Sequence, residues 1–425
     1  MEPPASTNAG NAASALHRAL VDRLQNTGYI HTPAVEAAFR AVPRHLFLPA
    51  VALDTVYADE AIPTKRLGGK TVSSSSQPTI MAIMLEQLDL HPGHRVLEIG
   101  AGTGYNAALM AHIVGDRGHV VTVDVDDDLV AGAREQLAAA GFERVHVVCS
   151  DGGLGYPAGA PYDRIILTVG AWDIAPAWQQ QLKPDGRLVL PLVIRGNVQE
   201  SVALEHAGGH LTSISVHACG FMPLRGTCAG PKTPIQLGPH PSLTITTEGH
   251  GMVDARAVYA LLAGPSRAWP TAVRVRSGEM WAGLSLWLAV HEPGFCTLTA
   301  EGESAEHAIV PCLLRPSGRC PVCVTSGLLE DGRLSVLTRT ADPPAPLEQP
   351  DDAVPFELLA RGFGPGEALA HRLIERVVSW DAAGRPSDDG LRIRVYPRET
   401  EYVASTNEAV VVKRWTQLVL DWPDR

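Results

Sequence analysis

A glycine-rich loop between a strand-like and a helix-like segment constrains the fold of this chain more than any other feature. Residues 98–104 are Glu-Ile-Gly-Ala-Gly-Thr-Gly, after the apolar run 95–99 and before the helical pattern of 105–114. Glycines at such a junction let the backbone turn sharply and approach a bound ligand closely. The pattern is typical of the first strand-to-helix turn in a ligand-binding α/β sheet.

Strand-like and helix-like segments alternate on both sides of this loop. Such alternation with short links builds a parallel sheet with helices on both faces, so we predict a doubly wound, Rossmann-like α/β fold. The predicted strands are 95–99, 119–125, 145–149, 163–169 and 187–194, and the predicted helices are 12–26, 33–41, 79–88, 105–114, 129–140 and 177–182.

The pattern changes after residue 227. Over 228–425, which we call the extension, strand-like runs such as 284–290 are more frequent than helical ones. We therefore divide the chain into an α/β domain at 1–227 and an additional C-terminal α+β domain at 228–425. Residues 1–15 are small and polar, and we expect them to be disordered.

Composition and short motifs exclude several classes of protein. The net charge is -11, from 35 Lys and Arg against 46 Asp and Glu, and no basic run occurs, which disfavours nucleic-acid binding. No apolar run reaches the roughly 18 residues of a membrane span, and no secretion signal is evident, so we expect a cytoplasmic protein without membrane contact. Cys320 and Cys323 form a lone CxxC motif. A structural zinc site needs four ligands, so we predict free thiols and no metal site.

Acidic residues at successive strand ends indicate the ligand of the glycine loop. Glu98 precedes the glycines, Asp124 ends the next predicted strand and Asp151 follows the third. A carboxylate at the second strand end can accept hydrogen bonds from ribose hydroxyls, and a carboxylate beside the loop suits a ligand with a positive amine. The dinucleotide fingerprint would require glycine where Tyr105 stands. We therefore predict S-adenosylmethionine (SAM) as cofactor, with ordinary strand-to-helix turns as the alternative.

Several segments in this order resemble protein-L-isoaspartate O-methyltransferases. The resemblance covers about residues 16–227 and implies a SAM-dependent carboxyl O-methyltransferase that releases S-adenosylhomocysteine. The segments that carry it are PRHLFLPA (43–50), YADEAIP (57–63), VLEIGAGTGYNAA (96–108), VVTVDVD (120–126), SDGGLGYPAGAPYDRIILTVGA (150–171), QLKPDGRLVLPL (181–192) and GFMPLRG (220–226).

This resemblance also implies site residues. A family segment of the type Ser-Ala-Pro-His aligns with 76–79, so we expect Ser76 to hold the acceptor carboxylate by a hydrogen bond, helped by Ser75 and Thr79. A flexible polar loop is the alternative for this serine run. The residues assigned to the cofactor are Gly100, Gly102, Thr103, Tyr105, Asp124, Val125, Ser150, Asp151 and Gly152, with Glu98 beside the methionyl amine.

Two departures from the family pattern lead to our prediction of the substrate. Thr79 stands where the family has histidine, and the chain continues past the GFMPLRG element at which repair enzymes of the family end. The extension resembles that of members associated with lanthipeptide, graspetide and lasso peptide biosynthesis. Those enzymes methylate an aspartate of a ribosomally synthesised, modified precursor peptide (RiPP), and the ester then closes to an aspartimide.

We therefore predict a precursor peptide, already cyclised, as the substrate, and isoaspartate repair of damaged proteins as the alternative. The extension is expected to bind the peptide. Its tryptophans are expected to pack in a core, with peptide anchoring as the alternative role; they are Trp269, Trp281, Trp287, Trp380, Trp415 and Trp422.

Overall fold

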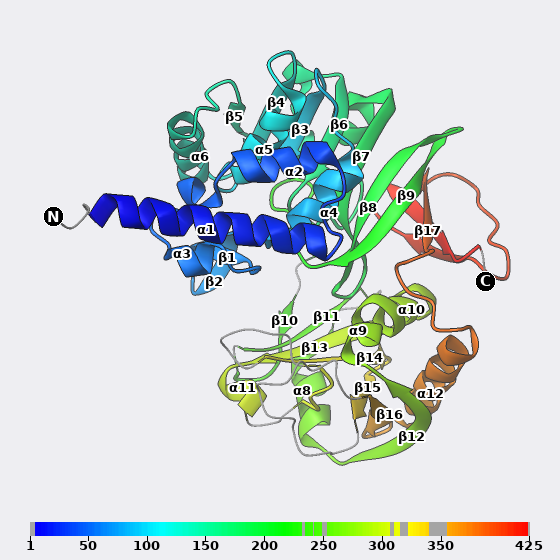
Figure 1. Cartoon of the computed structure of the whole chain (residues 1–425). Coiled ribbons are helices and arrows are strands. Elements are labelled where there is room, and N and C mark those ends of the chain that lie inside the picture. The colour runs from blue at the N-terminus through cyan, green and yellow to red at the C-terminus, as the bar shows by residue number, and fades with distance from the viewer. Residues whose placement is uncertain are drawn as a thin grey trace.

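The computed structural model describes residues 5–231, 234–240, 242–248, 253–306, 310–314, 322–339 and 355–423 (Figure 1). The helices up to residue 227 are α1 (Ala5–Asn26), α2 (Pro33–Ala41), η1 (Arg44–Phe47), α3 (Leu53–Val56), α4 (Pro78–Leu88), α5 (Tyr105–Val114), α6 (Asp127–Ala139), η2 (Gly152–Leu154), η3 (Pro157–Gly159) and α7 (Pro176–Gln181). The strands of this part are β1 (Ile62–Leu67), β2 (Lys70–Ser75), β3 (Arg95–Ile99), β4 (His119–Asp124), β5 (His146–Cys149), β6 (Tyr162–Leu167), β7 (Leu182–Arg195), β8 (Val198–Ala207) and β9 (His210–Cys219).

The extension adds a second set of elements. Its helices are α8 (Ala255–Ala263), α9 (Ser277–Glu279), η4 (Met280–Leu284), α10 (Ser285–His291), α11 (Glu303–Glu306) and α12 (Glu367–Ala382). Its strands are β10 (Ile235–Gln236), β11 (Leu243–Thr247), β12 (Ser266–Val275), β13 (Phe295–Glu301), β14 (Val322–Glu330), β15 (Arg333–Arg339), β16 (Phe356–Phe363), β17 (Arg392–Pro397), β18 (Ala409–Val412) and β19 (Thr416–Asp421).

A ten-stranded sheet, in the order β18-β19-β17-β9-β8-β7-β6-β3-β4-β5, forms the centre of the first part. Strands β5, β4, β3, β6 and β7 are parallel, and β8 and β9 follow β7 as antiparallel strands. Successive side chains of a strand point to opposite faces, and both faces are apolar here, as expected for buried parallel strands. The predicted Rossmann-like α/β fold is confirmed.

Each face of this sheet is covered by different helices. Val96 of β3 belongs to the core cluster that includes buried residues of α1, α2, α4 and α5, whereas its neighbour Leu97 belongs to a second cluster. The second cluster contains Leu190 of β7, Trp178 of α7 and Leu288 of α10. A helix of the extension therefore covers part of a face of the first sheet, and one apolar core joins the two parts of the chain.

The end of the chain returns to the first sheet. β17 pairs with β9 through Val395 and Leu211, and β19 pairs with β17 on its other side; Figure 1 shows β17 beside β9. Only the intervening part of the extension forms the separate seven-stranded sheet, in the order β10-β11-β13-β14-β15-β16-β12. The expected division at residue 227 therefore does not separate the sheets. Pairing with β17 removes the exposed edge that β9 would otherwise present.

Two local expectations are corrected by the structure. The run 284–290, expected to be a strand, ends η4 and forms most of α10, because periodicity alone cannot distinguish a short buried strand from a buried helix. The N-terminal segment 1–15, expected to be disordered, is helical from Ala5 onward, since α1 continues through its alanine-rich sequence. Residues 1–4 and Cys320 lie outside the described residues.

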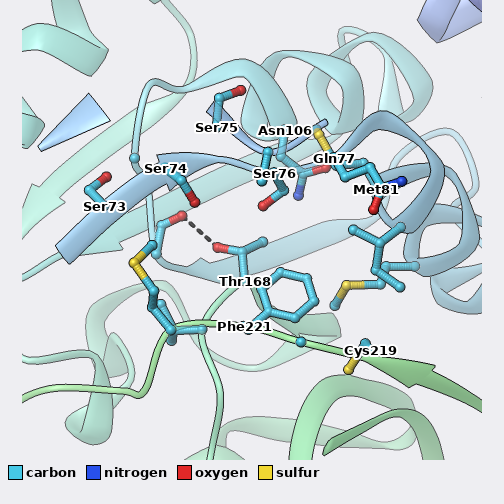
Figure 2. A pocket seen from close by; sticks show the side chains of 18 of the residues that line it. Ser73, Ser74, Ser75, Ser76, Gln77, Met81, Asn106, Thr168, Cys219 and Phe221 are labelled. Carbon is cyan, nitrogen blue, oxygen red and sulfur yellow. Dashed lines mark hydrogen bonds between the residues drawn. The ribbon is translucent and has the colours of Figure 1, made fainter. Parts of the chain in front are cut away.

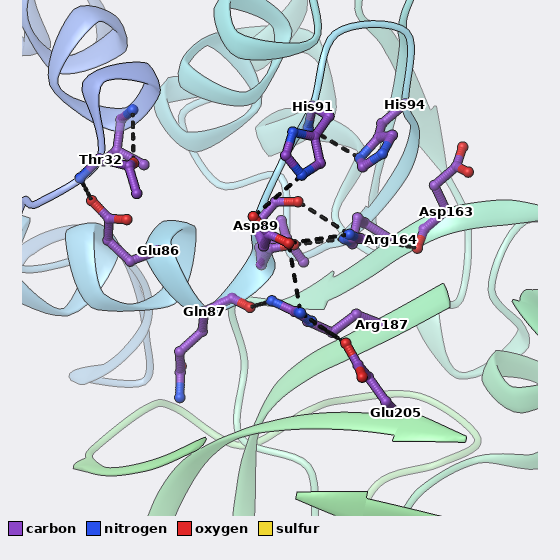
Figure 3. Close-up of polar contacts among 12 residues, drawn as sticks. Thr32, Glu86, Gln87, Asp89, His91, His94, Asp163, Arg164, Arg187 and Glu205 are labelled. Atoms are coloured by element: carbon purple, nitrogen blue, oxygen red, sulfur yellow. Dashed lines mark hydrogen bonds and ion pairs between the residues drawn. The ribbon is translucent and has the colours of Figure 1, made fainter. Parts of the chain in front are cut away.

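Helix α4 is fixed to the sheet at its C-terminal end (Figure 3). Arg187 donates a hydrogen bond of 2.6 Å to the carbonyl of Gln87, and Arg164 donates one of 2.7 Å to the carbonyl of Leu88. The Asp89 carboxylate lies 3.7 Å from Arg164 and 3.6 Å from Arg187. Cations at a helix C-terminus complement the helix dipole, so strands β6 and β7 set the position of α4 and of the segment that precedes it.

The described ranges hold neither a candidate membrane-spanning helix nor a candidate metal site. No helix there combines the length and apolar character needed to cross a membrane. In the same ranges, no group of three or more His, Cys, Asp or Glu side chains is arranged to hold a metal ion.

Candidate active site

A cleft of about 870 Å³ opens at the carboxyl ends of β3, β4 and β6. The glycine loop 100–104 lines one part of it, and residues 73–77, at the end of β2 and just before α4, line another. Figure 2 shows Ser74 and Ser76 on one side of the cleft and Thr168 and Phe221 facing them. Ligands of open α/β sheets bind at this edge. They lie in the crevice between two neighbouring strands whose following connections lead to opposite sides of the sheet.

The glycine loop needs glycine at specific positions. Gly100 has a φ of 109°, and a Cβ atom there would lie 2.4 Å from Oγ1 of Thr168. The Thr168 hydroxyl donates a hydrogen bond of 2.7 Å to the carbonyl of Gly100, which fixes this close approach. Gly104, at the start of α5, has a φ of 84°. These conformations keep the backbone of the loop open to a ligand in the cleft.

Glu98 places a carboxyl group at the base of the cleft that has no cationic partner in the described ranges. Its side chain is completely buried, and it accepts hydrogen bonds of 2.8 Å from Asn106 and 2.6 Å from Thr122. Burial raises the pKa of Glu98 to about 7, against the lowering effect of these two hydrogen bonds. A ligand ammonium group would favour the ionised form of this carboxyl.

Asp124 and Asp151 have different surroundings. Asp124 lines the cleft, and its carboxylate accepts a hydrogen bond of 3.1 Å from the backbone N–H of Gly102. The Asp151 carboxylate instead accepts backbone N–H groups of Gly153 at 2.9 Å and Thr227 at 2.7 Å. Asp151 therefore fixes the segment after β9 to the end of β5.

The expected cofactor residues mostly share the cleft. Ser150 and Asp151 are not among the residues that line it, although they adjoin Gly152, which does. Those that line it are Glu98, Gly100, Gly102, Thr103, Tyr105, Asp124, Val125 and Gly152.

Asp126 joins two segments beside the cleft that are far apart in sequence. Its carboxylate accepts hydrogen bonds from Arg225 at 2.7 Å and lies 3.1 Å from Nζ of Lys65 in β1. The hydrogen bond from Arg225 is the main cause of a lowered pKa of Asp126. Sequence analysis assigned no role to these three residues, because only folding brings the β1–β2 hairpin and the segment after β9 to the end of β4.

The three expected acceptor residues line the cleft but differ in their hydrogen bonds. The Ser75 hydroxyl accepts a hydrogen bond of 3.3 Å from Arg44, and the Thr79 hydroxyl donates one of 2.6 Å to Asp59. The Ser76 hydroxyl makes no hydrogen bond to any residue in the described ranges, and Ser76 and Asn106 both line the cleft (Figure 2). Of the three, Ser76 is the residue whose hydroxyl is available to a ligand.

Arg44 holds the acceptor segment in place. Its guanidinium is fully buried and donates to the carbonyl of Ser76 at 2.9 Å and to that of Val56 at 2.8 Å. It also reaches the carbonyls of Ala58, Glu60 and Ser75. The segment PRHLFLPA contains Arg44, but its role was missed because its partners are backbone carbonyls, which leave no sequence signal.

Among its described residues, the extension contributes one side chain to the cleft. Trp281 of η4 is 41% exposed and lines the cleft on the side of Cys219 and Phe221. Trp380, by contrast, is 1% exposed and belongs to the main core. Trp380 therefore packs in the core, whereas Trp281 lies where its side chain can contact a substrate. The remaining tryptophans of the extension pack in or against the main core; they are Trp269, Trp287, Trp415 and Trp422.

Comparison with known proteins identifies the family. The profile of the protein-L-isoaspartate(D-aspartate) O-methyltransferase (PCMT) family matches residues 15–229. The protein-L-isoaspartate O-methyltransferase of Methanopyrus kandleri is 43% identical over 209 residues, which cover 49% of this chain and 90% of that protein. The corresponding enzyme of Hyperthermus butylicus is 41% identical over 217 residues, covering 49% and 88%.

Solved structures with a similar fold include other members of this family. One protein-L-isoaspartate O-methyltransferase, at 22% identity and a TM-score of 0.49, covers 92% of this chain and 99% of its own. Another, from Plasmodium falciparum in complex with S-adenosyl-L-homocysteine, has 19% identity and a TM-score of 0.43, covering 49% and 98%. The chain belongs to the PCMT family and is a SAM-dependent carboxyl O-methyltransferase that acts on protein or peptide substrates.

Proposed function

We propose that the chain methylates the free α-carboxylate of an isoaspartyl residue, whose side-chain carboxyl forms the backbone amide, in a protein or peptide. The observation that carries this proposal is the continuity of the cleft from the glycine loop to the Ser76 hydroxyl. The two curated relatives support it, because both are protein-L-isoaspartate O-methyltransferases and are 43% and 41% identical to this chain.

The residues of the cleft fit SAM in a defined order. Glu98 would face the methionyl ammonium, because it is a buried carboxyl without a cationic partner in the described ranges. Asp124 would accept the ribose hydroxyls. Val125 and Gly152 would flank the adenine, with Ser150 and Asp151 supporting that end of the site. When bound, SAM supplies an electrophilic methyl group, and S-adenosylhomocysteine is the product.

The acceptor side of the cleft needs to orient its substrate rather than to activate it. A carboxyl with an ordinary pKa of about 4 is already ionised at neutral pH, so no general base is required. The Ser76 hydroxyl would donate a hydrogen bond to one carboxylate oxygen and leave the other to accept the methyl group. Arg44 and Asp59 would act through Ser75, Ser76 and Thr79 by fixing the backbone that presents this hydroxyl.

The methyl ester explains how methylation leads to repair. The backbone nitrogen of the next residue attacks the ester carbonyl, methanol leaves, and a five-membered imide forms. Because this attack is intramolecular, it needs no further catalytic group of the protein. Hydrolysis of the imide returns part of the product to normal aspartate.

Paired peptides test this proposal. The protein should form S-adenosylhomocysteine with a linear isoaspartyl peptide and not with the same peptide containing aspartate. Ser76→Ala should lower kcat/KM by about tenfold or more, the loss expected when a positioning hydrogen bond to a charged group is removed. Ser266→Ala, an exposed residue at the start of β12, is the control and should keep full activity. Equal turnover of both peptides would contradict the proposal.

A second candidate is the methylation of an aspartate in a modified precursor peptide, as the sequence predicted. One observation favours it: Trp281, from the extension, lines the cleft beside Cys219, so residues 228–425 can contribute to a peptide-binding surface. The two curated relatives are matched over about 90% of their length by the first half of this chain. Incubation with a cyclised precursor should then add the mass of a methylene group and later lose that of methanol. No mass change with precursors encoded near the gene would exclude this candidate.

A further inference from the structure

A small chamber of about 50 Å³ opens off the cleft beside Cys219 and Trp281. The chamber and the cleft share lining residues, so they are contiguous; these are Asn197, Gln199, Ala218, Cys219 and Trp281. Its deeper wall comes from the extension and carries hydroxyl groups, those of Ser285, Thr297, Thr325 and Ser326. The chamber therefore lies between β8–β9 of the methyltransferase sheet and the extension.

Glu200 of β8 is one of the residues that line this chamber, and its carboxyl oxygens, shielded from solvent, have no hydrogen-bond partner among the described residues. The side chain is 1% exposed. Burial, together with the charge of Asp388, raises the pKa of Glu200 well above its ordinary value. Asp388 accepts a hydrogen bond of 2.8 Å from the backbone N–H of Ala218, which places a second carboxylate near the chamber.

An unpaired buried carboxyl group needs an explanation, since the large majority of buried polar groups in proteins are hydrogen-bonded. Two carboxyl groups and several hydroxyls, with no cation near Glu200 in the described ranges, make the chamber complementary to a positive charge. The functional site described above gives Glu200 no task. A cationic group of the substrate would supply the missing partner.

We propose that this chamber is a specificity subsite that receives the ammonium group of a lysine side chain in the peptide substrate. A volume of about 50 Å³ admits an ammonium group with its last methylene groups, whereas the planar guanidinium of arginine is wider. Trp281 at the entrance can pack against the lysine methylenes and attract the cation through its ring. The subsite rests on the proposed function, because it requires a peptide in the cleft.

Peptides that differ at one position test the subsite. Isoaspartyl peptides would carry lysine, acetyl-lysine or norleucine at each position beside the isoaspartate, and kcat and KM would be measured for each. At the matching position the wild-type protein should prefer lysine over norleucine by about tenfold, mainly through KM, as expected for a charge-assisted hydrogen bond. Glu200→Gln should abolish this preference, so that the variant shows equal kcat/KM for the lysine and norleucine peptides.

Two further variants serve as controls. Glu205→Gln changes the same residue type on the same strand, but its carboxylate is 38% exposed and pairs with Arg187, so the lysine preference should persist. Asp388→Asn should reduce the lysine preference without abolishing it. This variant tests the subsite independently if Glu200→Gln unfolds at a much lower temperature than the wild type.

The outcomes separate this inference from the proposed function. Equal kcat/KM for lysine and norleucine peptides at every position, or a preference retained by Glu200→Gln, would overturn the subsite. A preference for acetyl-lysine would overturn it in favour of a neutral ligand. If no isoaspartyl peptide is turned over, the proposed function fails, and fluorescence anisotropy of labelled, unreactive lysine and norleucine peptides still decides the subsite.

Discussion

Replacing Glu98 by glutamine tests how the protein binds the amine of SAM and what that capacity costs in stability. In the free protein the pKa of Glu98 is about 7 instead of its ordinary 4.5. At 1.36 kcal/mol per pKa unit, keeping this carboxyl ionised above pH 7 lowers the free energy of unfolding by about 3 kcal/mol. Glutamine has nearly the same shape and can still hydrogen-bond Asn106 and Thr122.

The sign of the effect follows from proton linkage. Because the folded state holds this proton more tightly than the unfolded state, wild-type stability falls as the pH rises from 4.5 to about 7. The glutamine variant lacks this loss. It should therefore be more stable than the wild type by up to about 3 kcal/mol near pH 8, and the difference should shrink as the pH approaches about 4.5.

Cofactor binding should change in the opposite direction. The ammonium group of the ligand requires ionised Glu98, so wild-type affinity should fall nearly tenfold per pH unit below about pH 7. The variant should bind more weakly at neutral pH and lose this dependence. Isothermal titration with S-adenosylhomocysteine between about pH 6 and pH 8, combined with thermal melts, measures both effects.

A matched variant sharpens the test. The hydrogen bond from Thr122 lowers the pKa of Glu98, so Thr122→Val should move the inflection of the wild-type affinity profile to higher pH. Parallel affinity profiles for the wild type and Glu98→Gln would refute the reasoning, because they would show that Glu98 does not titrate against the ligand.

Three further substitutions test the packing around the site. Arg44→Met should lower kcat/KM for methylation by at least about tenfold while changing the dissociation constant of S-adenosylhomocysteine little, because Arg44 fixes the Ser75–Ser76 backbone and does not line the cleft; equal losses in both would contradict this division. Gly100→Ala should abolish measurable binding of S-adenosylhomocysteine, since the new Cβ would lie 2.4 Å from Thr168 Oγ1 at a φ of 109°; isothermal titration checks this, and unchanged affinity would contradict it. Lys413→Met should reduce the free energy of unfolding by about 3–5 kcal/mol in urea titrations, because Lys413 is fully buried and its Nζ donates to Glu248 at 2.9 Å and to the carbonyl of Ile194 at 2.9 Å. Adding Glu248→Gln to that variant should restore part of the loss, and an additive loss would argue against pairing.

The sequence predicted the central part of the fold and of the cofactor site because both depend on local patterns. The glycine loop, Glu98 and Asp124 follow directly from strand ends, and parallel strands bring their carboxyl ends to one edge. The serine run lines the cleft, and its role in holding the acceptor carboxylate stays a prediction. The hairpin of β1 and β2 was missed, since its residues 59–78 show loop-like composition rather than strand alternation.

Other features depended on contacts between distant parts of the chain. The run 284–290 is apolar in either secondary structure, and only its packing against the first sheet makes it helical. Strand β17 joins β9 because backbone edges pair irrespective of sequence distance, which no local pattern encodes. Isoaspartate and precursor-peptide substrates also remain alternatives on sequence grounds, since the groups that bind a peptide come from several elements.

The amino-acid sequence by itself therefore determined the α/β sheet, the cofactor and the class of reaction, because short-range spacing of glycines, carboxylates and apolar residues encodes them. Only the tertiary structure decided which serine hydroxyl is available, that Arg44 holds its backbone, that Trp281 lines the cleft, and that Glu200 lines the chamber next to it. The hydrogen bonds and the burial of a side chain depend on which residues are its neighbours in three dimensions. A buried carboxyl can be recognised as unpaired only when the positions of all neighbouring hydrogen-bond donors are known.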